Sequence, residues 1–174
     1  MKTKISFFLV LMSLIVTSAF PQEKTKKELK EERKLEKQKQ VEAMVNDTLF
    51  IFVGRTALPT GMRSVNLSSN PNYIKFQPEM IESEMPYFGK GYSGIGYGGD
   101  SGLKFKGKPE KFTVEKKKKN YQIDTNVKVE SDNFRLSLSV TFEGSASLSI
   151  ISNNRSTISY QGEISPLKKS GENK

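Results

Sequence analysis

Apolar and polar side chains alternate strictly along the C-terminal third of the chain. In residues 120–129, for example, Tyr121, Ile123 and Val127 fall on one face, and polar residues lie between them. This period of two is typical of antiparallel strands that bury one face and expose the other. Connectors of hairpin length, such as Glu143-Gly144, predict that neighbouring strands pair as a meander. The alternating segments are 120–129, 133–142, 146–150 and 158–164.

Shorter strand signals precede this region. Residues 48–55 form a first apolar strand, and the turn-forming residues 57–61 are expected to end it. Further short strands are expected at 64–67, 73–77, 80–85, 103–105 and 111–115. Because only one helical segment is available to cover such a sheet, the sheet must curl onto itself. We therefore expect an all-β fold, an antiparallel meander forming a barrel or strongly curved sheet of about eight to ten strands, preceded by a charged N-terminal helix.

The side chains that point into this sheet are large. The inward face of a single predicted strand carries, in succession, Phe134, Leu136, Leu138, Val140 and Phe142. The interior of a small barrel is just wide enough for such side chains to fill it, which favours a packed core. The alternative is an apolar cavity, as in a lipocalin-like carrier of a lipid or small apolar ligand.

The N-terminal residues have the pattern of an export signal. Lys2 and Lys4 precede an apolar run, residues 5–16, and small residues follow at 17–19. An apolar run of about a dozen residues suits a cleaved signal peptide, whereas a membrane span needs about 20. We expect no transmembrane segment. The expected organisation is a signal peptide at 1–19, a charged helical spacer at 20–46, a β domain at 47–166 and a disordered tail at 167–174.

Three residue types are missing from the chain: cysteine, histidine and tryptophan. Without cysteine there are no disulfides and no lipid attachment at the cleavage site, so we expect a soluble exported protein, periplasmic or extracellular and not lipid-anchored. Without histidine the chain lacks the usual base of serine and cysteine hydrolases and the commonest zinc ligand. We therefore expect no enzymatic activity, no metal and no cofactor.

The basic balance of the chain bears on its partners. A net charge of +9 suits acidic surfaces such as anionic lipid headgroups, and we expect at most weak contact with them. Nucleic acid would match the charge but not an exported location, so we do not expect it as a partner. The expected partner is an envelope component or an apolar small molecule.

Four consecutive lysines, Lys116, Lys117, Lys118 and Lys119, lie between two predicted strands and form what we call the lysine tip. Adjacent ammonium groups repel one another and favour water or anions. The lysine tip is therefore a candidate anion contact. The alternative is a solvated hairpin tip that discourages pairing at the sheet edge.

A glycine-rich segment, residues 89–99, matches the G-x-G-x-x-G pattern twice. A dinucleotide site would need a helix after the glycines, but a strand pattern follows instead. Tyrosine interleaved with glycine gives a contact surface at low entropic cost, so the segment is a candidate recognition loop. The alternative is a structural loop that packs its aromatic rings inward. The candidate recognition residues are Tyr87, Phe88, Tyr92, Tyr97 and Asp100.

Two carboxylates, Glu82 and Glu84, share one face of a predicted strand. Such a pair could serve acid–base chemistry or bind calcium, and with Asp100 it is the basis of a third hypothesis, a carboxylate-based hydrolase. A carboxylate pair on a solvated strand face is much more common.

The segment Met85-Pro86-Tyr87-Phe88-Gly89-Lys90-Gly91-Tyr92 resembles the domain of unknown function 4251 family of small exported bacterial proteins. Further similarities are the glycine-rich stretch 96–103, the lysine tip and the final alternating strand at 158–164. Met85, Lys90 and Gly91 depart conservatively from the family pattern. The resemblance implies a signal-bearing, β-rich protein of the envelope of Gram-negative bacteria. It implies no catalytic residues, since the family has no assigned function.

Overall fold

The computed structural model describes residues 25–68, 72–92 and 102–167. The signal segment 1–19 and residues 168–174 of the tail lie outside this part of the chain. One helix, α2 (Lys26–Asn46), precedes the strands. The strands are β1 (Phe50–Pro59), β2 (Val65–Asn66), β3 (Tyr73–Gln77), β4 (Met80–Met85), β5 (Leu103–Gly107), β6 (Pro109–Lys116), β7 (Asn120–Val129), β8 (Asp132–Thr141), β9 (Ser145–Ser152) and β10 (Ile158–Pro166).

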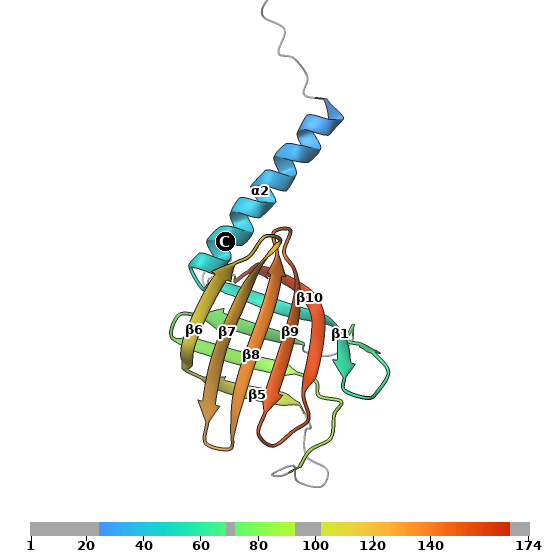
Figure 1. Ribbon diagram of the computed structural model, residues 1–174, viewed down its shortest axis with the longest axis vertical. Coiled ribbons are helices and arrows are strands. Elements are labelled where there is room, and N and C mark those ends of the chain that lie inside the picture. Colours follow the sequence, from blue (N-terminus) through green and yellow to red (C-terminus); the bar gives the residue numbers. More distant parts are fainter. Residues whose placement is uncertain (1–24, 69–71, 93–101, 168–174) are drawn as a thin grey trace, which may run out of the picture. The chain divides into compact units, whose positions relative to one another are not determined.

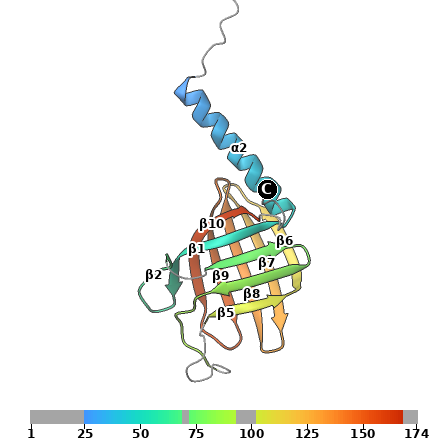
Figure 2. The ribbon, with the colours of Figure 1, turned by 180° about the vertical axis from the view of Figure 1, so that it is seen from behind.

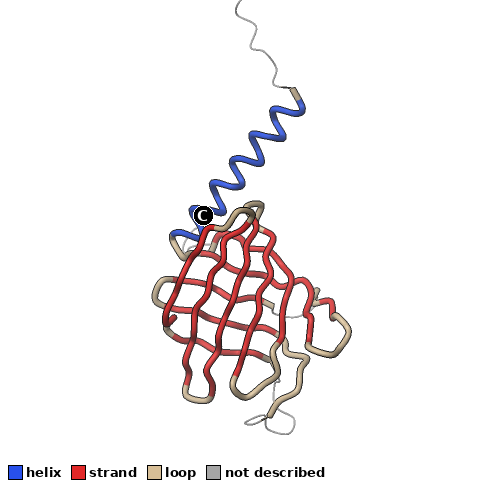
Figure 3. Tube along the Cα trace, in the orientation of Figure 1, coloured by secondary structure: helices blue, strands red, loops and turns tan. Residues whose placement is uncertain are grey.

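All these strands belong to one 10-stranded antiparallel sheet in the order β5-β4-β3-β1-β10-β9-β8-β7-β6, with β2 paired to β1 alone. Figures 1 and 2 show that the sheet is nearly closed into a barrel, in which β6 to β10 form one wall and β1, β3, β4 and β5 cross behind them. Strands account for most of the trace after α2 (Figure 3). The predicted all-β antiparallel barrel is confirmed.

The barrel closes by pairing its first long strand with its last. β1 runs antiparallel to β10, with Phe52 opposite Ile164 and Pro59 opposite Ile158. Two meanders, β3–β4–β5 and β6 to β10, are thereby joined through β1. The only residue between β5 and β6 is Lys108, yet these strands form the two edges of the sheet. The gap in the barrel therefore lies between β5 and β6, although these two strands are consecutive in the chain.

Both edge strands have features that disfavour pairing with another chain. β5 is short and carries the exposed Lys104 and Lys106. β6 begins at Pro109, and its pairing with β7 is irregular between Glu110 and Thr113. Lysine, proline and bulges are the usual means by which natural sheets protect their edges.

The predicted end of the first strand was wrong. β1 continues through Ala57, Leu58 and Pro59, because these residues pair with β10, and the turn comes only at residues 60–62. Pro59 occupies the final position of the strand, where its missing N–H costs no ladder hydrogen bond. Local turn chemistry was therefore overridden by long-range pairing.

Side chains from both walls fill the described interior. Phe105 of β5 stacks on Phe134 of β8, with ring centroids 4.2 Å apart, so two strands of opposite walls touch through their rings. Phe50 and Phe76 stack at 4.7 Å on the neighbouring strands β1 and β3. Most inward residues of the alternating strands are buried as their period of two predicts, whereas Val129 is partly buried and Phe142, also partly buried, lies beyond the end of β8.

Helix α2 contributes to the core through its last turns. The chain divides into two compact units, Met1–Arg33 and Lys34–Lys174, and α2 continues from the first into the second. Within the second unit Val41 and Val45 are fully buried with the barrel core. No helix among the described residues is long and apolar enough to cross a membrane.

The end of α2 has an unfavourable residue at its capping position. Leu49 donates its N–H to the carbonyl of Met44 and Thr48 to that of Val45, which is the Schellman arrangement. Its central residue adopts a left-handed conformation, and here that residue is Thr48, with φ of 51°. Glycine normally takes this position because it has no Cβ to clash.

Replacing Thr48 with glycine should therefore raise the unfolding free energy by about 1 kcal/mol, since relief of the left-handed strain exceeds the added entropy of the unfolded chain. Urea unfolding followed by circular dichroism measures the change. Thr157→Gly is the matched control, because Thr157 is exposed and is not among the residues at positive φ. It should be neutral or destabilising. An equal stabilisation of both variants would contradict the strain at Thr48.

Candidate functional site

One end of the barrel is organised around a buried tyrosine. Tyr87 is 6% exposed. Its hydroxyl lies 2.9 Å from the carbonyl oxygens of Lys90 and Ser156 and 2.8 Å from the Ser156 Oγ. The Lys90 N–H donates to the same Ser156 Oγ at 3.0 Å. Tyr87 thus ties the segment after β4 to the connection between β9 and β10.

Backbone pairing continues this attachment. Gly91 and Arg155 form an isolated antiparallel bridge. The Tyr92 N–H donates to the Asn154 carbonyl at 2.7 Å, and the Ser156 N–H donates to the Lys90 carbonyl at 2.9 Å. We call residues 86–92 and 154–156 the loop base.

Arg155 links the loop base to the start of β5. Its guanidinium lies 5.2 Å from the ring centroid of Tyr87 and donates to the Gly102 carbonyl at 3.0 Å. Tyr92 and Gly102, the described residues on either side of the stretch 93–101, are therefore both attached to residues 154–155. Two of the five candidate residues, Tyr97 and Asp100, lie outside the described part of the chain.

A second tyrosine supports the loop base from within the core. The Tyr160 hydroxyl donates to the Pro86 carbonyl at 2.8 Å. Burial raises the pKa of Tyr160 well above its usual range, so the hydroxyl stays protonated and keeps donating. Sequence reasoning did not identify Arg155, Ser156 or Tyr160 as parts of this site. Tyr160 is one of the residues that resemble the family pattern, which was the only available signal.

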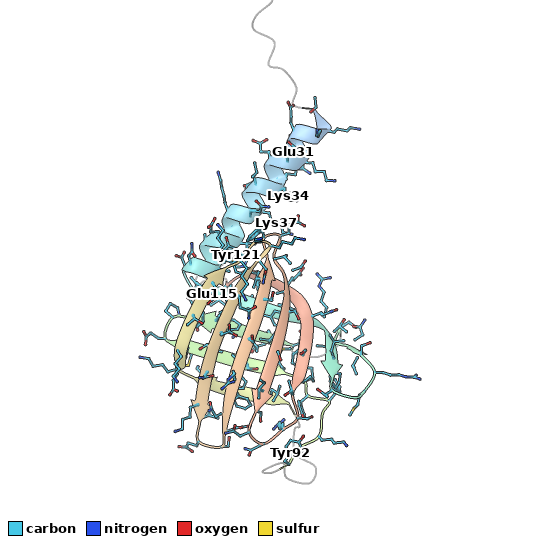
Figure 4. The ribbon with its side chains drawn as sticks, viewed as in Figure 1. Glu31, Lys34, Lys37, Tyr92, Glu115 and Tyr121 are labelled. Atoms are coloured by element: carbon cyan, nitrogen blue, oxygen red, sulfur yellow. The ribbon has the colours of Figure 1, made fainter. Side chains whose placement is uncertain are left out.

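The remaining candidate aromatics differ in exposure. Phe88 is half-buried and packs against the core. Tyr92 is 70% exposed, the highest value among the exposed large hydrophobic residues of the described chain. Figure 4 shows Tyr92 at the end of the barrel opposite to Glu115 and Tyr121. The loop base therefore holds the backbone of Tyr92 and leaves its ring in solvent.

The lysine tip lies at that opposite end. Lys116 donates to Glu42 at 2.7 Å, and this hydrogen bond raises the pKa of Lys116 and lowers that of Glu42. Its ammonium group also lies 5.6 Å from the ring centroid of Tyr121. Lys117, Lys118 and Lys119 are exposed. One of the four lysines, Lys116, therefore already forms an ion pair within the protein.

The two carboxylates of the hydrolase hypothesis lie on the outer face of β4, among lysines. Lys75 donates to Glu82 at 3.0 Å, and this hydrogen bond lowers the pKa of Glu82. The Tyr73 hydroxyl donates to Glu84 at 2.9 Å, which raises the pKa of Tyr73. An ionised Glu82 cannot act as a general acid at neutral pH. Among the described residues no cluster of three or more acidic side chains is placed to hold a metal ion.

A shallow groove of about 440 Å³ crosses the outer face of β8, β9, β10 and β1. At its rim Arg55 forms an ion pair with Glu163 at 2.6 Å. It carries hydroxyl groups but no aromatic side chain. Its lining residues are Arg55, Thr56, Ser139, Thr141, Ser145, Ala146, Ser147, Gln161 and Gly162.

Replacing Tyr87 with phenylalanine should lower the unfolding free energy by about 1–2 kcal/mol, because carbonyl groups of the loop base lose their donor. Urea unfolding measures the loss, and hydrogen exchange should be faster at the Tyr92 and Ser156 amides. Tyr73→Phe is the matched control, since the Tyr73 hydroxyl bonds a partly exposed carboxylate and its loss should cost less. Unchanged exchange at both amides in Tyr87→Phe would contradict the anchoring role.

Comparison with known proteins agrees with the fold. The profile of a family described as a domain of unknown function, DUF4251, matches residues 32–164. The crystal structure of a DUF4251 family protein from Bacteroides eggerthii DSM 20697 is similar, with a TM-score of 0.59 and 14% sequence identity, covering 75% of this chain and 87% of that chain. At this identity the likeness extends to the fold alone. The search of curated proteins found no match.

Proposed function

The chain belongs to the DUF4251 family, which is described as a domain of unknown function, and we propose that it is an exported, non-enzymatic binding domain of the cell envelope that recognises its partner at the loop base. One observation carries the proposal. Tyr92 exposes its ring on a backbone that is hydrogen-bonded to Asn154 and flanked by the Gly91–Arg155 bridge. A rigid aromatic side chain loses little entropy on binding, which makes it an effective anchor for a partner.

The contacts inside the barrel support recognition on the surface. Phe105 and Phe134 meet across the two walls at 4.2 Å, so this part of the interior holds side chains. A carrier of lipocalin type would need that space for its ligand. The surface end of the barrel is therefore preferred over the interior as the binding site.

The outer carboxylates support a role other than catalysis. Glu82 is held by Lys75, and Lys106 lies 3.9 Å away from the same carboxylate. Glu84 is held by the Tyr73 hydroxyl. Carboxylates held in this way on an open strand face form structural ion pairs. An acid–base pair would instead need two groups whose surroundings move their pKa values in opposite directions.

Export is tested with the full chain carrying a C-terminal tag in a Gram-negative host. Cleavage after Ala19 should yield a shortened protein in the periplasm or medium, identified by its intact mass. Leu9→Arg with Leu11→Arg interrupts the apolar run and should leave the uncleaved chain in the cytoplasm. A full-length wild-type chain that stays in the cytoplasm would overturn the envelope assignment.

Recognition at the loop base is tested by placing a photo-crosslinking amino acid at position 92. Irradiation of the purified domain with envelope fractions should give one dominant adduct. The control position is Ile151, which is 44% exposed on the outer face of β9. Equal adduct yields at positions 92 and 151 would reject the loop base as the binding surface.

A further inference from the structure

We propose that the lysine tip docks the barrel on the phosphate-bearing headgroups of an anionic membrane surface, with Tyr92 directed away from that surface. This contact is additional to the recognition proposed for Tyr92 and does not depend on it. It concerns three residues of the lysine tip, namely Lys117, Lys118 and Lys119.

These three lysines differ from most other lysines of the barrel in their surroundings. Within the described part of the chain none of them has an ion pair. On β5 and just after it, by contrast, Lys104 lies 3.9 Å from Glu84, Lys106 lies 3.9 Å from Glu82 and Lys108 lies 2.9 Å from Glu79. Lys104, Lys106 and Lys108 thus each have a carboxylate partner. The same number of lysines in the tip, Lys117 to Lys119, have none among the described residues.

Of the acidic residues around the lysine tip, Glu42 and Glu143 are already paired, and the exposed Glu115, which precedes Lys116 in β6, is a single carboxylate beside three ammonium groups. Glu42 binds Lys116 at 2.7 Å, and Glu143, in the neighbouring hairpin, binds Lys34 at 3.1 Å. These carboxylates cannot neutralise the three remaining ammonium groups without giving up their own partners. The tip therefore presents uncompensated positive charge to whatever it faces.

The backbone beneath these ammonium groups is fixed. The Lys117 N–H donates to the Asn120 carbonyl at 2.8 Å, and the Asn120 side chain donates to the Ser139 Oγ at 2.8 Å. Lys116, next in the chain, is held over the Tyr121 and Phe142 rings. A fixed hairpin loses only side-chain freedom when it binds, so little of the electrostatic gain is lost.

A planar surface suits this geometry better than a small ligand. Lys117, Lys118 and Lys119 are all exposed on one hairpin tip, so each can meet a different headgroup. Each lysine near an anionic membrane strengthens binding by about a factor of five, so three give on the order of a hundredfold.

Docking by the lysine tip also orients the barrel. Glu115 and Tyr121, which adjoin the tip in β6 and β7, lie at one end of the barrel in Figure 4, and Tyr92 lies at the other. A domain held by the first end presents Tyr92 to the aqueous side. The recognition surface stays free for a partner.

Vesicle sedimentation tests the contact directly. The domain should bind vesicles of phosphatidylcholine with phosphatidylglycerol at low salt, and not vesicles of phosphatidylcholine alone. The triple variant Lys117→Gln/Lys118→Gln/Lys119→Gln should bind on the order of a hundredfold more weakly. The matched control is Lys104→Gln/Lys106→Gln/Lys108→Gln, which removes the same charge from paired lysines and should retain most of the binding. Circular dichroism verifies that each variant is folded.

Equal losses in the two triple variants would overturn the proposal, because net charge alone would then explain binding. Absence of vesicle binding by the wild type at low salt would overturn it as well, as would binding of soluble polyphosphate without binding of vesicles. None of these three results depends on Tyr92, so failure here is distinct from failure of the proposed recognition.

Orientation is tested with single fluorophores on introduced cysteines, since the natural chain has none. Vesicles should shield a fluorophore at Glu115→Cys from iodide quenching and leave one at Tyr92→Cys accessible. The opposite pattern, or equal shielding at both positions, would contradict the orientation.

Discussion

Replacing Gly162 with alanine should cost the domain about 3 kcal/mol of unfolding free energy or more, one of the largest effects of any single methyl group in the barrel. Gly162 of β10 lies opposite Gly54 of β1, where the pairing of the two strands shifts register. A Cβ at Gly162 would overlap the carbonyl oxygen of Val53 and lie 3.0 Å from the Cα of Gly54. Both obstacles are backbone atoms, which cannot rotate away as a side chain would.

Urea unfolding of Gly162→Ala measures this loss. Gly61→Ala is the control, because a Cβ at Gly61 meets nothing within 4 Å but its φ of +75° is strained for alanine. That control should lose only about 1 kcal/mol. A loss in Gly162→Ala no larger than in Gly61→Ala would show that β1 and β10 can separate at this point without penalty.

Truncating either ring of the pair that joins the two walls should also be severe. Phe105→Ala and Phe134→Ala should each lower the unfolding free energy by about 3–5 kcal/mol, through lost burial and the cavity left behind. Thermal and urea unfolding measure the losses. Phe112→Ala, at a partly buried position on the edge strand β6, is the control and should cost clearly less.

The double variant separates stacking from burial. If the rings interact directly, Phe105→Ala/Phe134→Ala should lose about 0.5–1.5 kcal/mol less than the sum of the single variants. Full additivity would mean that the two rings are buried independently. It would also weaken the argument for a filled interior.

Strand positions could be predicted from the sequence, but their order in the sheet could not. Tyr121, Ile123 and Val127 alternate with polar residues, and local alternation is sufficient to identify a strand and its buried face. The pairing of β1 with β10 joins residues such as Arg55 and Glu163, 108 positions apart. No local pattern identifies such a partner, so residues 57–59 have the composition of a turn although they pair with β10.

The candidate site, too, could be predicted only in part from the sequence. The sequence marked Tyr87 and Tyr92 as similar aromatic residues in one glycine-rich region. Their different roles depend on the connection between β9 and β10, since the Tyr87 hydroxyl bonds Ser156, 69 positions away. Burial of one ring and exposure of the other is a tertiary property, and composition could only identify the region.

The pairing of the first long strand with the last has a consequence for the order of folding. A chain that emerges N-terminus first, from a ribosome or through a membrane pore, presents β1 long before β10 exists to pair with it. The meander from β6 to β10 can form from local contacts, but the pairing of β1 with β10 cannot form until the final strand is available. Sheets dominated by such distant pairings fold slowly. The barrel therefore stays open until its last strand is free to pair with β1.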